Sequence, residues 1–183
     1  PWRYGLLLHG KPGTGKSSFI REMARDLNVP VYRFHLSEMS GPTFRRHWTE
    51  SQENAPCIVA FEDIDATFDG RENKAAESTQ ARHLLTFDTL LNTISGIDPA
   101  DGVLLVVTTN HLDKVDEAMK RAGRLDIHVE FRPLDESGRK QIANRILSGY
   151  PTLAEEAITS GSGETGAEFT ERCQSIFLKE YWS

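Results

Sequence analysis

The chain has 183 residues, 38% of them hydrophobic, which suffices for about one domain with a buried core. Its 21 basic and 27 acidic residues give a net charge of −6, which disfavours a non-specific nucleic-acid binder. The longest aliphatic run, residues 103–107, is far shorter than the ~20 residues of a membrane-spanning helix, and two cysteines, Cys57 and Cys173, make neither a zinc cluster nor a disulfide framework.

Apolar runs of strand length alternate with helical segments. Strands are expected over residues 4–8, 31–35, 57–61, 103–108 and 127–131. Helices are expected over 17–27, 43–53, 79–94 with Gly96 as C-cap, 116–121, 136–147 with Asp135 as N-cap, and 167–181. The third and fourth strands are continuously apolar, as expected when both faces are covered. This alternation predicts an α/β fold with a five-stranded parallel sheet and helices on both faces.

Two segments interrupt this pattern. Residues 69–78 are polar and charged and are expected to form a surface loop. Residues 159–166 are rich in glycine and serine and predict a flexible linker. The chain begins at Pro1, without an initiator methionine or a signal peptide, almost at its first motif, so we expect it to be an excerpt of a longer protein.

Residues 10–17 fit the pattern G-x-x-x-x-G-K-[ST] between an apolar strand and an amphipathic helix. Glycines let backbone N–H groups turn inward as an anion-binding nest, and the helix start adds its positive dipole end. Lys16 is expected to neutralise the β- and γ-phosphates, and the Ser17 hydroxyl to take one Mg²⁺ position. A glycine-rich turn with a stray lysine is the alternative, which the flanking elements disfavour. The predicted nucleotide-binding residues are Gly10, Lys11, Pro12, Gly13, Thr14, Gly15, Lys16, Ser17 and Ser18.

Two carboxylates, Glu62 and Asp63, follow the third strand. In a Walker B element one acid holds the Mg²⁺ shell and the next orients or deprotonates the attacking water. We expect Glu62 to hold Mg²⁺ with Ser17, and Asp63 to activate water. Asp63 is one methylene shorter than the usual glutamate, so Asp65 is a candidate to share this work, although a cap or brace is its simpler role. A solvated acidic turn is the alternative for the pair.

Asn110 ends the fourth strand, where an amide can position water or a γ-phosphate oxygen. Arg121 and Arg124 flank a small pair of residues after a short predicted helix, and their bidentate donors suit a neighbouring subunit's γ-phosphate. An ordinary turn asparagine and two surface arginines are the alternatives. The predicted catalytic residues are thus Glu62, Asp63, Asn110, Arg121 and Arg124.

Four segments resemble those of an AAA ATPase in their order and spacing. They are the loop 10–17, Glu-Asp-Ile-Asp-Ala at 62–66, Thr-Thr-Asn-His at 108–111 and Arg-Ala-Gly-Arg-Leu-Asp at 121–126. The similarity covers roughly residues 4–131. The Glu-Asp order and the segment 85–96 resemble the branch that contains the mitochondrial chaperone family for respiratory complex III assembly. That family translocates the folded Rieske iron–sulfur protein across the inner membrane as a ring.

The resemblance implies an AAA core over residues 1–133 and a partial helical lid over 134–183. It implies ATP and Mg²⁺ as ligands, and a homo-oligomeric ring, a hexamer or heptamer, whose arginines act in trans on a neighbour's site. It further implies an unidentified protein client, no nucleic-acid partner, and a mitochondrial inner-membrane location through a segment outside this chain. Lys11 and Ala122 depart from the family pattern, since proline is commoner at both positions.

The loop after the second strand lacks the aromatic-hydrophobic-glycine tripeptide of many AAA unfoldases; Met39-Ser40-Gly41 is the nearest match. This mildly favours the chaperone branch over threading of an unfolded chain. Two other functions remain open from sequence. One is a nucleotide-binding module that holds ATP without turnover, and the other is a DNA-directed AAA loader, which the acidic charge disfavours.

Overall fold

The computed structural model describes residues 4–74, 84–95, 100–121 and 123–182. The chain divides into two compact units, one made of Pro1–Gly10 with Lys16–Glu130 and the other of Lys11–Gly15 with Phe131–Ser183. The central part of the glycine-rich loop therefore belongs by its contacts to the unit that contains the C-terminal helices.

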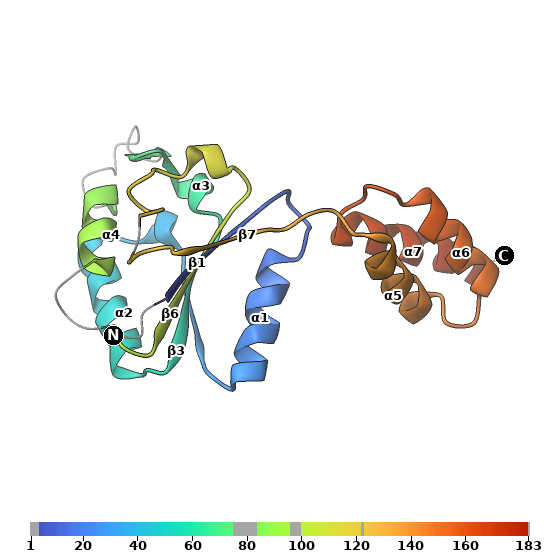
Figure 1. The fold of residues 1–183 in the computed structure, drawn as a ribbon, viewed down its shortest axis with the longest axis horizontal. Helices are drawn as coiled ribbons and strands as arrows, with labels where there is room; N and C mark the ends of the chain where they lie inside the picture. The colour runs from blue at the N-terminus through green and yellow to red at the C-terminus, as the bar shows by residue number, and fades with distance from the viewer. Residues whose placement is uncertain (1–3, 75–83, 96–99, 122, 183) are drawn as a thin grey trace. The chain divides into compact units, whose positions relative to one another are not determined.

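A five-stranded sheet forms the first unit, as the sequence predicts. Its strands are β1 (Tyr4–His9), β2 (Val31–Phe34), β3 (Cys57–Phe61), β6 (Val103–Thr109) and β7 (Ile127–Glu130). They lie in the order β2-β3-β6-β1-β7, and every neighbouring pair is parallel (Figure 1). The strands are joined by crossovers, so their carboxyl ends all meet at one edge of the sheet.

Helices cover both faces of this sheet. The helix α1 (Lys16–Leu27) lies on one face, and α2 (Gly41–Glu53) and α4 (Phe87–Ile94) lie on the other (Figure 1). The larger hydrophobic core lies on the α2 side, where the sheet residues Leu7, Phe34, Val59, Phe61, Leu105 and Val107 are buried against both helices. Burying side chains of this size stabilises the fold by about 1.5–3 kcal/mol each.

The period-two alternation of side chains decides which residues reach which face. Val59 and Phe61 belong to the core under α2, so Ile58 and Ala60 point to the α1 side. Glu62 follows Ala60 by two residues, and this parity directs it to the face on which α1 begins.

Side-chain caps fix the starts of several helices. Ser40 accepts a hydrogen bond from the Thr43 backbone N–H at the start of α2, and Thr86 does the same for Thr89 at the start of α4. The predicted cap Asp135 is confirmed, since its Oδ1 accepts from the Gly138 N–H 2.7 Å away. Such caps satisfy backbone donors that have no partner within the helix.

Some predicted elements of this first unit differ in the structure. Residues 117–120 form a turn instead of a helix, and the backbone hydrogen bonds from Met119 N–H to Asp116 O and from Lys120 N–H to Glu117 O span three residues instead of four. The predicted helix 79–94 is observed only as α4, while residues 79–83 and the C-cap Gly96 lie outside the described residues. The predicted loop 69–78 contains the end of a short hairpin, β4 (Phe68–Asp69) with β5 (Glu72–Asn73), and residues 75–78 also lie outside the described part. A single helical turn, α3 (Ile64–Thr67), was not predicted.

The second unit carries the helices α5 (Glu136–Ile146), α6 (Pro151–Ser160) and α7 (Gly166–Tyr181) around its own buried cluster. Phe169 and Cys173 of α7 are fully buried in this cluster. The sequence analysis missed α6, although proline in its first turn and the spacing of Ala154, Ala157 and Ile158 are helical signals. No helix among the described residues is long and apolar enough to span a bilayer.

Residues 159–166 were predicted as a flexible linker, and the structure shows instead the end of α6, a turn at 161–163 and the start of α7. The Gly161 N–H donates to Ala157 O at 2.9 Å, and Glu164 O accepts from the Leu134 N–H at 3.0 Å. A Cβ at Gly161 would lie 2.4 Å from the Phe169 ring, so glycine here permits close packing. Thr165 is 5% exposed and forms a capping box with Glu168 of α7.

Candidate active site

Three neighbouring strands of the sheet end in predicted site residues. Gly10 follows β1, Glu62 and Asp63 follow β3, and Asn110 follows β6. Because β3, β6 and β1 are adjacent and parallel, their carboxyl ends bring these residues to one place.

The glycine-rich loop uses backbone conformations that favour glycine. Gly10, Gly13 and Gly15 have φ values of 140°, 77° and 101°. A Cβ on Gly15 would meet nothing within 4 Å, so the requirement there is conformational and not steric. Within the loop, the Thr14 hydroxyl donates to Lys11 O at 2.8 Å. Pro12, between the first two of these glycines, and Ser18, after the last, are exposed.

Lys16 is the buried cation of the site. Its Nζ donates hydrogen bonds to Gly10 O and to Asn110 Oδ1, each at 2.7 Å. Burial lowers the pKa of the Lys16 ammonium, and the nearby charges of Asp63 and Asp65 act in the opposite direction. A buried ammonium held at the end of a sheet strand is well placed to receive an anion.

Ser17 and Glu62 bring two hard oxygen ligands together. The Ser17 hydroxyl donates to Glu62 Oε2 at 2.6 Å, although 45 residues separate the two in the chain. Hydroxyl and carboxylate oxygens are the ligands that Mg²⁺ prefers, so this pair fits the predicted metal. The other oxygen of the carboxylate, Oε1, lies 3.3 Å from the Arg33 Nε in an ion pair.

Asp63 is exposed and leaves the strand in the left-handed region, with φ 50° and ψ 54°. Its backbone N–H donates to the Thr108 hydroxyl at 2.9 Å, and its Oδ1 accepts from Asn110 Nδ2 at 3.2 Å. Left-handed backbone is unfavourable for a residue other than glycine and is concentrated at functional sites. The turn after β3 therefore orients this carboxylate toward the end of β6.

Asp65, the alternative acid, is in a different environment. It is 7% exposed, and its Oδ1 accepts from the Thr109 hydroxyl at 2.7 Å and from the Asn110 N–H at 3.0 Å. Its backbone carbonyl accepts from Lys74 Nζ. The carboxylate thus braces the end of β6, which matches the simpler role considered for it.

The two predicted arginine fingers differ in their surroundings. Arg124 donates from Nε to Ser95 Oγ at 2.8 Å and from Nη1 to Ala118 O, so its side chain is held by its own chain. Arg121 is exposed, and Ala122 between them lies outside the described residues.

Burial alone would raise the pKa of Asp116, but hydrogen bonds from Ala118 and Arg71 and the charges of Arg71 and Arg121 lower it.

In the second unit, α7 contacts the centre of the glycine-rich loop. The Ala167 N–H, in the first turn of α7, donates to Gly13 O at 2.9 Å. A Cβ on Gly13 would lie 2.9 Å from the Ala167 Cβ, so the approach leaves no room for a side chain. The capping hydrogen bonds with Thr165 lower the pKa of Glu168 despite the opposing effect of burial, and the charge of Lys11 contributes.

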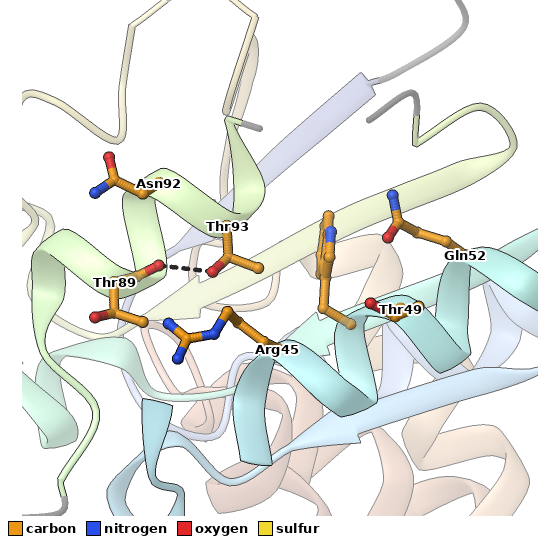
Figure 2. Close-up of a pocket in the computed structure, with 7 residues that line it drawn as sticks. Arg45, Thr49, Gln52, Thr89, Asn92 and Thr93 are labelled. Carbon is orange, nitrogen blue, oxygen red and sulfur yellow. Dashed lines mark hydrogen bonds between the residues drawn. The ribbon is translucent and has the colours of Figure 1, made fainter. Parts of the chain in front are cut away.

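A separate pocket of about 310 Å³ lies between α2 and α4. Figure 2 shows its lining, with Arg45, Thr49 and Gln52 on α2 and Thr89, Asn92 and Thr93 on α4. None of the predicted site residues lines this pocket.

The structure joins Lys16, Asn110 and Asp63 by hydrogen bonds and, separately, joins Ser17 to Glu62. It also adds residues that the sequence analysis did not single out. Thr108 fixes the Asp63 backbone, and Arg33 pairs with Glu62. The position of Thr108 near the end of a buried strand could have indicated its contact with the Asp63 backbone. Nothing in the local sequence indicates the ion pair between Arg33 and Glu62.

Known proteins are similar to this chain over most of its length. The model of the ATPase family associated with various cellular activities (AAA) matches residues 6–133. The probable mitochondrial chaperone bcs1 of Schizosaccharomyces pombe is 31% identical over 156 residues, covering 85% of this chain and 34% of that protein. The mitochondrial chaperone BCS1 of Bos taurus is 36% identical over 158 residues, covering 85% of this chain and 38% of that protein.

A relative with a different activity matches equally well. The ATP-dependent zinc metalloprotease FtsH 1 of Symbiobacterium thermophilum is 35% identical over 176 residues, covering 90% of this chain and 29% of that protein. The chain thus spans about a third of the length of these relatives. The matches confirm the resemblance to AAA ATPases and to the mitochondrial chaperone branch that the motifs indicate.

Proposed function

The chain belongs to the AAA family of ATPases, and we propose that it binds ATP with Mg²⁺ and hydrolyses it to drive the remodelling or translocation of a protein client. The observation that supports this most directly is the network that joins Lys16 to Asn110 and Asn110 to Asp63. It connects a phosphate-binding cation to a carboxylate at the ends of adjacent strands.

Nucleotide binding uses the loop and the lysine. The backbone N–H groups of residues 10–17, apart from Pro12, which has none, and those at the start of α1 offer donors to phosphate oxygens. Lys16 donates to Gly10 O and Asn110 Oδ1 in this structure, and β- and γ-phosphate oxygens are stronger acceptors for the same ammonium. Ser18, in the first turn of α1, extends the set of hydroxyls available to the phosphates.

Ser17 and Glu62 are the protein residues that would hold Mg²⁺. When bound, this ion neutralises charge on the β- and γ-phosphates. The Ser17 hydroxyl now donates its proton to Glu62, and rotation of this hydroxyl makes its lone pairs available as a ligand.

Asp63, the carboxylate next to Glu62, acts as the general base. Asp63 is exposed, and Asn110 Nδ2 donates to its Oδ1, so the other carboxylate oxygen is the one we assign to accept the proton of the attacking water. Asp65 Oδ1 already accepts hydrogen bonds from the Thr109 hydroxyl and the Asn110 N–H, and this favours Asp63 as the proton acceptor.

Assembly and client form the second part of the proposal. We place Arg121 in a neighbouring subunit's site within a hexameric or heptameric ring, because it is exposed whereas Arg124 is bound by Ser95 and Ala118. An arginine supplied in trans is worth about 10³–10⁵ in rate. The relatives named mitochondrial chaperones support a chaperone role in mitochondria. An inner-membrane location, an ATPase core over residues 1–133 and a partial lid over 134–183 are further parts of the proposal.

Turnover and binding of labelled ATP, measured together at protein concentrations that permit rings, test this function. Asp63→Asn should retain ATP binding and lose hydrolysis by at least about 10²-fold, since it removes the base. Asp113→Asn, at an exposed aspartate beyond β6, is the matched control and should hydrolyse normally. Lys16→Ala should bind no ATP.

Three results would contradict the proposal. ATP binding at micromolar affinity without phosphate release, in the full-length protein, would favour a binding module without turnover. Hydrolysis that survives in Asp63→Asn would place the base elsewhere. Tight ATP binding by Lys16→Ala would remove the phosphate assignment from the loop.

A further inference from the structure

Arg33 is a charged residue near the end of the edge strand β2. Its neighbours Tyr32 and Phe34 pack on the core under α2, so strand alternation directs Arg33 to the opposite face. Its register partner on β3 is Ala60, which precedes Glu62 by two residues on the same face. The guanidinium therefore lies on the side of the sheet where α1 begins.

Glu62 is divided between two partners. Its Oε2 accepts from the Ser17 hydroxyl at 2.6 Å, and its Oε1 pairs with the Arg33 Nε at 3.3 Å. The Glu62 side chain is 27% exposed and that of Arg33 is 49% exposed, so the ion pair borders solvent and is open to exchange. The three residues form a chain from α1 through β3 to β2.

This arrangement places a cation beside the two oxygens that would hold Mg²⁺. A divalent ion that approaches Ser17 and Glu62 meets a carboxylate whose charge is already shared with a guanidinium. Mg²⁺ held there would share the Glu62 carboxylate with Arg33, and the like charges of the two cations would oppose each other at short range.

We propose that Arg33 is a positioning residue that holds Glu62 beside Ser17 in the nucleotide-free site and competes with Mg²⁺ for that carboxylate, so that it sets the Mg²⁺ concentration at which nucleotide binds. This inference rests on the proposed function, and it assigns a role to a residue outside the loop, the acid pair and Asn110. Removing the guanidinium frees Glu62 for the metal and strengthens Mg²⁺-dependent binding.

The test is a Mg²⁺ titration of fluorescent ADP binding to the full chain at a fixed nucleotide concentration. Arg33→Gln should lower the half-maximal Mg²⁺ concentration roughly 2- to 5-fold at low salt, as expected for an exposed ion pair, and the difference should shrink at high ionic strength. Arg33→Lys keeps a cation at this position and should retain the Mg²⁺ dependence of the unmodified chain.

The matched control is Arg25→Gln, which breaks an exposed ion pair to Glu22 on α1. It should leave the Mg²⁺ titration unchanged. A merely structural role of Arg33 would lower the melting temperature without this shift, so thermal unfolding is recorded for each variant.

The outcomes separate the two proposals. Normal nucleotide binding by Arg33→Gln with an unchanged or higher Mg²⁺ requirement would overturn the role of Arg33 and leave the proposed function intact. A shift of equal size in Arg25→Gln, or in Arg33→Lys, would also overturn it. If the unmodified chain binds no nucleotide at any Mg²⁺ concentration, both proposals fail.

Discussion

The Nζ of Lys16 and the Oδ1 of Asn110 are joined by a hydrogen bond of 2.7 Å, although 94 residues separate them in the chain. The same amide donates through Nδ2 to Asp63 Oδ1 at 3.2 Å. Asn110 therefore uses both polar atoms of its side chain to connect the cation of the glycine-rich loop with the acid after β3.

Asn110→Ala removes both of these contacts. We expect ATP binding to persist, because the loop and Lys16 remain, and hydrolysis to fall by about 10²-fold because the water and the base lose their orientation. Steady-state hydrolysis and nucleotide binding, measured side by side, test this. Asn92→Ala, at an exposed asparagine of α4 that lines the separate pocket, should match the unmodified chain in both. Equal rates for the two variants would refute a catalytic role for Asn110.

Asp65 is expected to matter for stability. Asp65→Ala leaves the Thr109 hydroxyl and the Asn110 N–H without their acceptor in a buried position, which should cost about 2–4 kcal/mol of unfolding free energy. Urea denaturation of Asp65→Ala and of the exposed control Asp113→Ala compares the two. Asp65→Asn keeps an acceptor oxygen and should lose less. A stable Asp65→Ala chain that no longer hydrolyses ATP would instead mark Asp65 as the base.

Gly5 lies where β1 approaches the backbone of Arg124 and Leu125. A Cβ at this position would stand 1.6 Å from the Arg124 carbonyl oxygen and 2.9 Å from the Leu125 Cα. Both are backbone atoms that cannot rotate away, so Gly5→Ala should destabilise the first unit by about 3 kcal/mol or more. Gly149→Ala adds the same methyl group where no atom lies within 4 Å, and its melting temperature should hardly change. Similar melting curves for both variants would contradict this packing.

The two cysteines should be unreactive in the folded chain. Burial raises the pKa of the Cys57 thiol above its ordinary value near 9.0, and burial raises that of Cys173 as well, with Glu164 adding to the shift and Arg172 opposing it. Above pH 9 the unfolded chain loses these protons first, so stability should fall as pH rises further. An aromatic disulfide reagent at pH 8 should label neither thiol until urea is added. Rapid labelling without urea would contradict the buried positions.

The strands β1, β3 and β6 were predictable because each contains a continuous apolar run, and such runs indicate strands covered on both faces. The residues 10–17, the acid pair and Asn110 were predictable because each motif directly follows or precedes such a strand. Their contacts with one another follow from the parallel order of β3, β6 and β1.

What the sequence did not reveal depends on packing between distant segments. Arg33 is one arginine in a short strand, and only the register of β2 with β3 places it beside Glu62. Arg121 and Arg124 occupy similar local patterns, and Ser95, 29 residues away, distinguishes them by binding Arg124. The segment after Asp116 was predicted as a helix, and its local sequence does not show that its backbone hydrogen bonds span three residues instead of four.

The hydrogen bond from the Ala167 N–H to Gly13 O has a practical meaning for anyone who trims this protein. A fragment that stops at Glu130 would keep the whole sequence of the glycine-rich loop. Gly13 O would nevertheless lose the hydrogen bond that the Ala167 N–H of α7 donates to it in the whole chain. An intact loop sequence therefore does not ensure that the loop keeps its hydrogen bonds, because one of them comes from the last quarter of the chain.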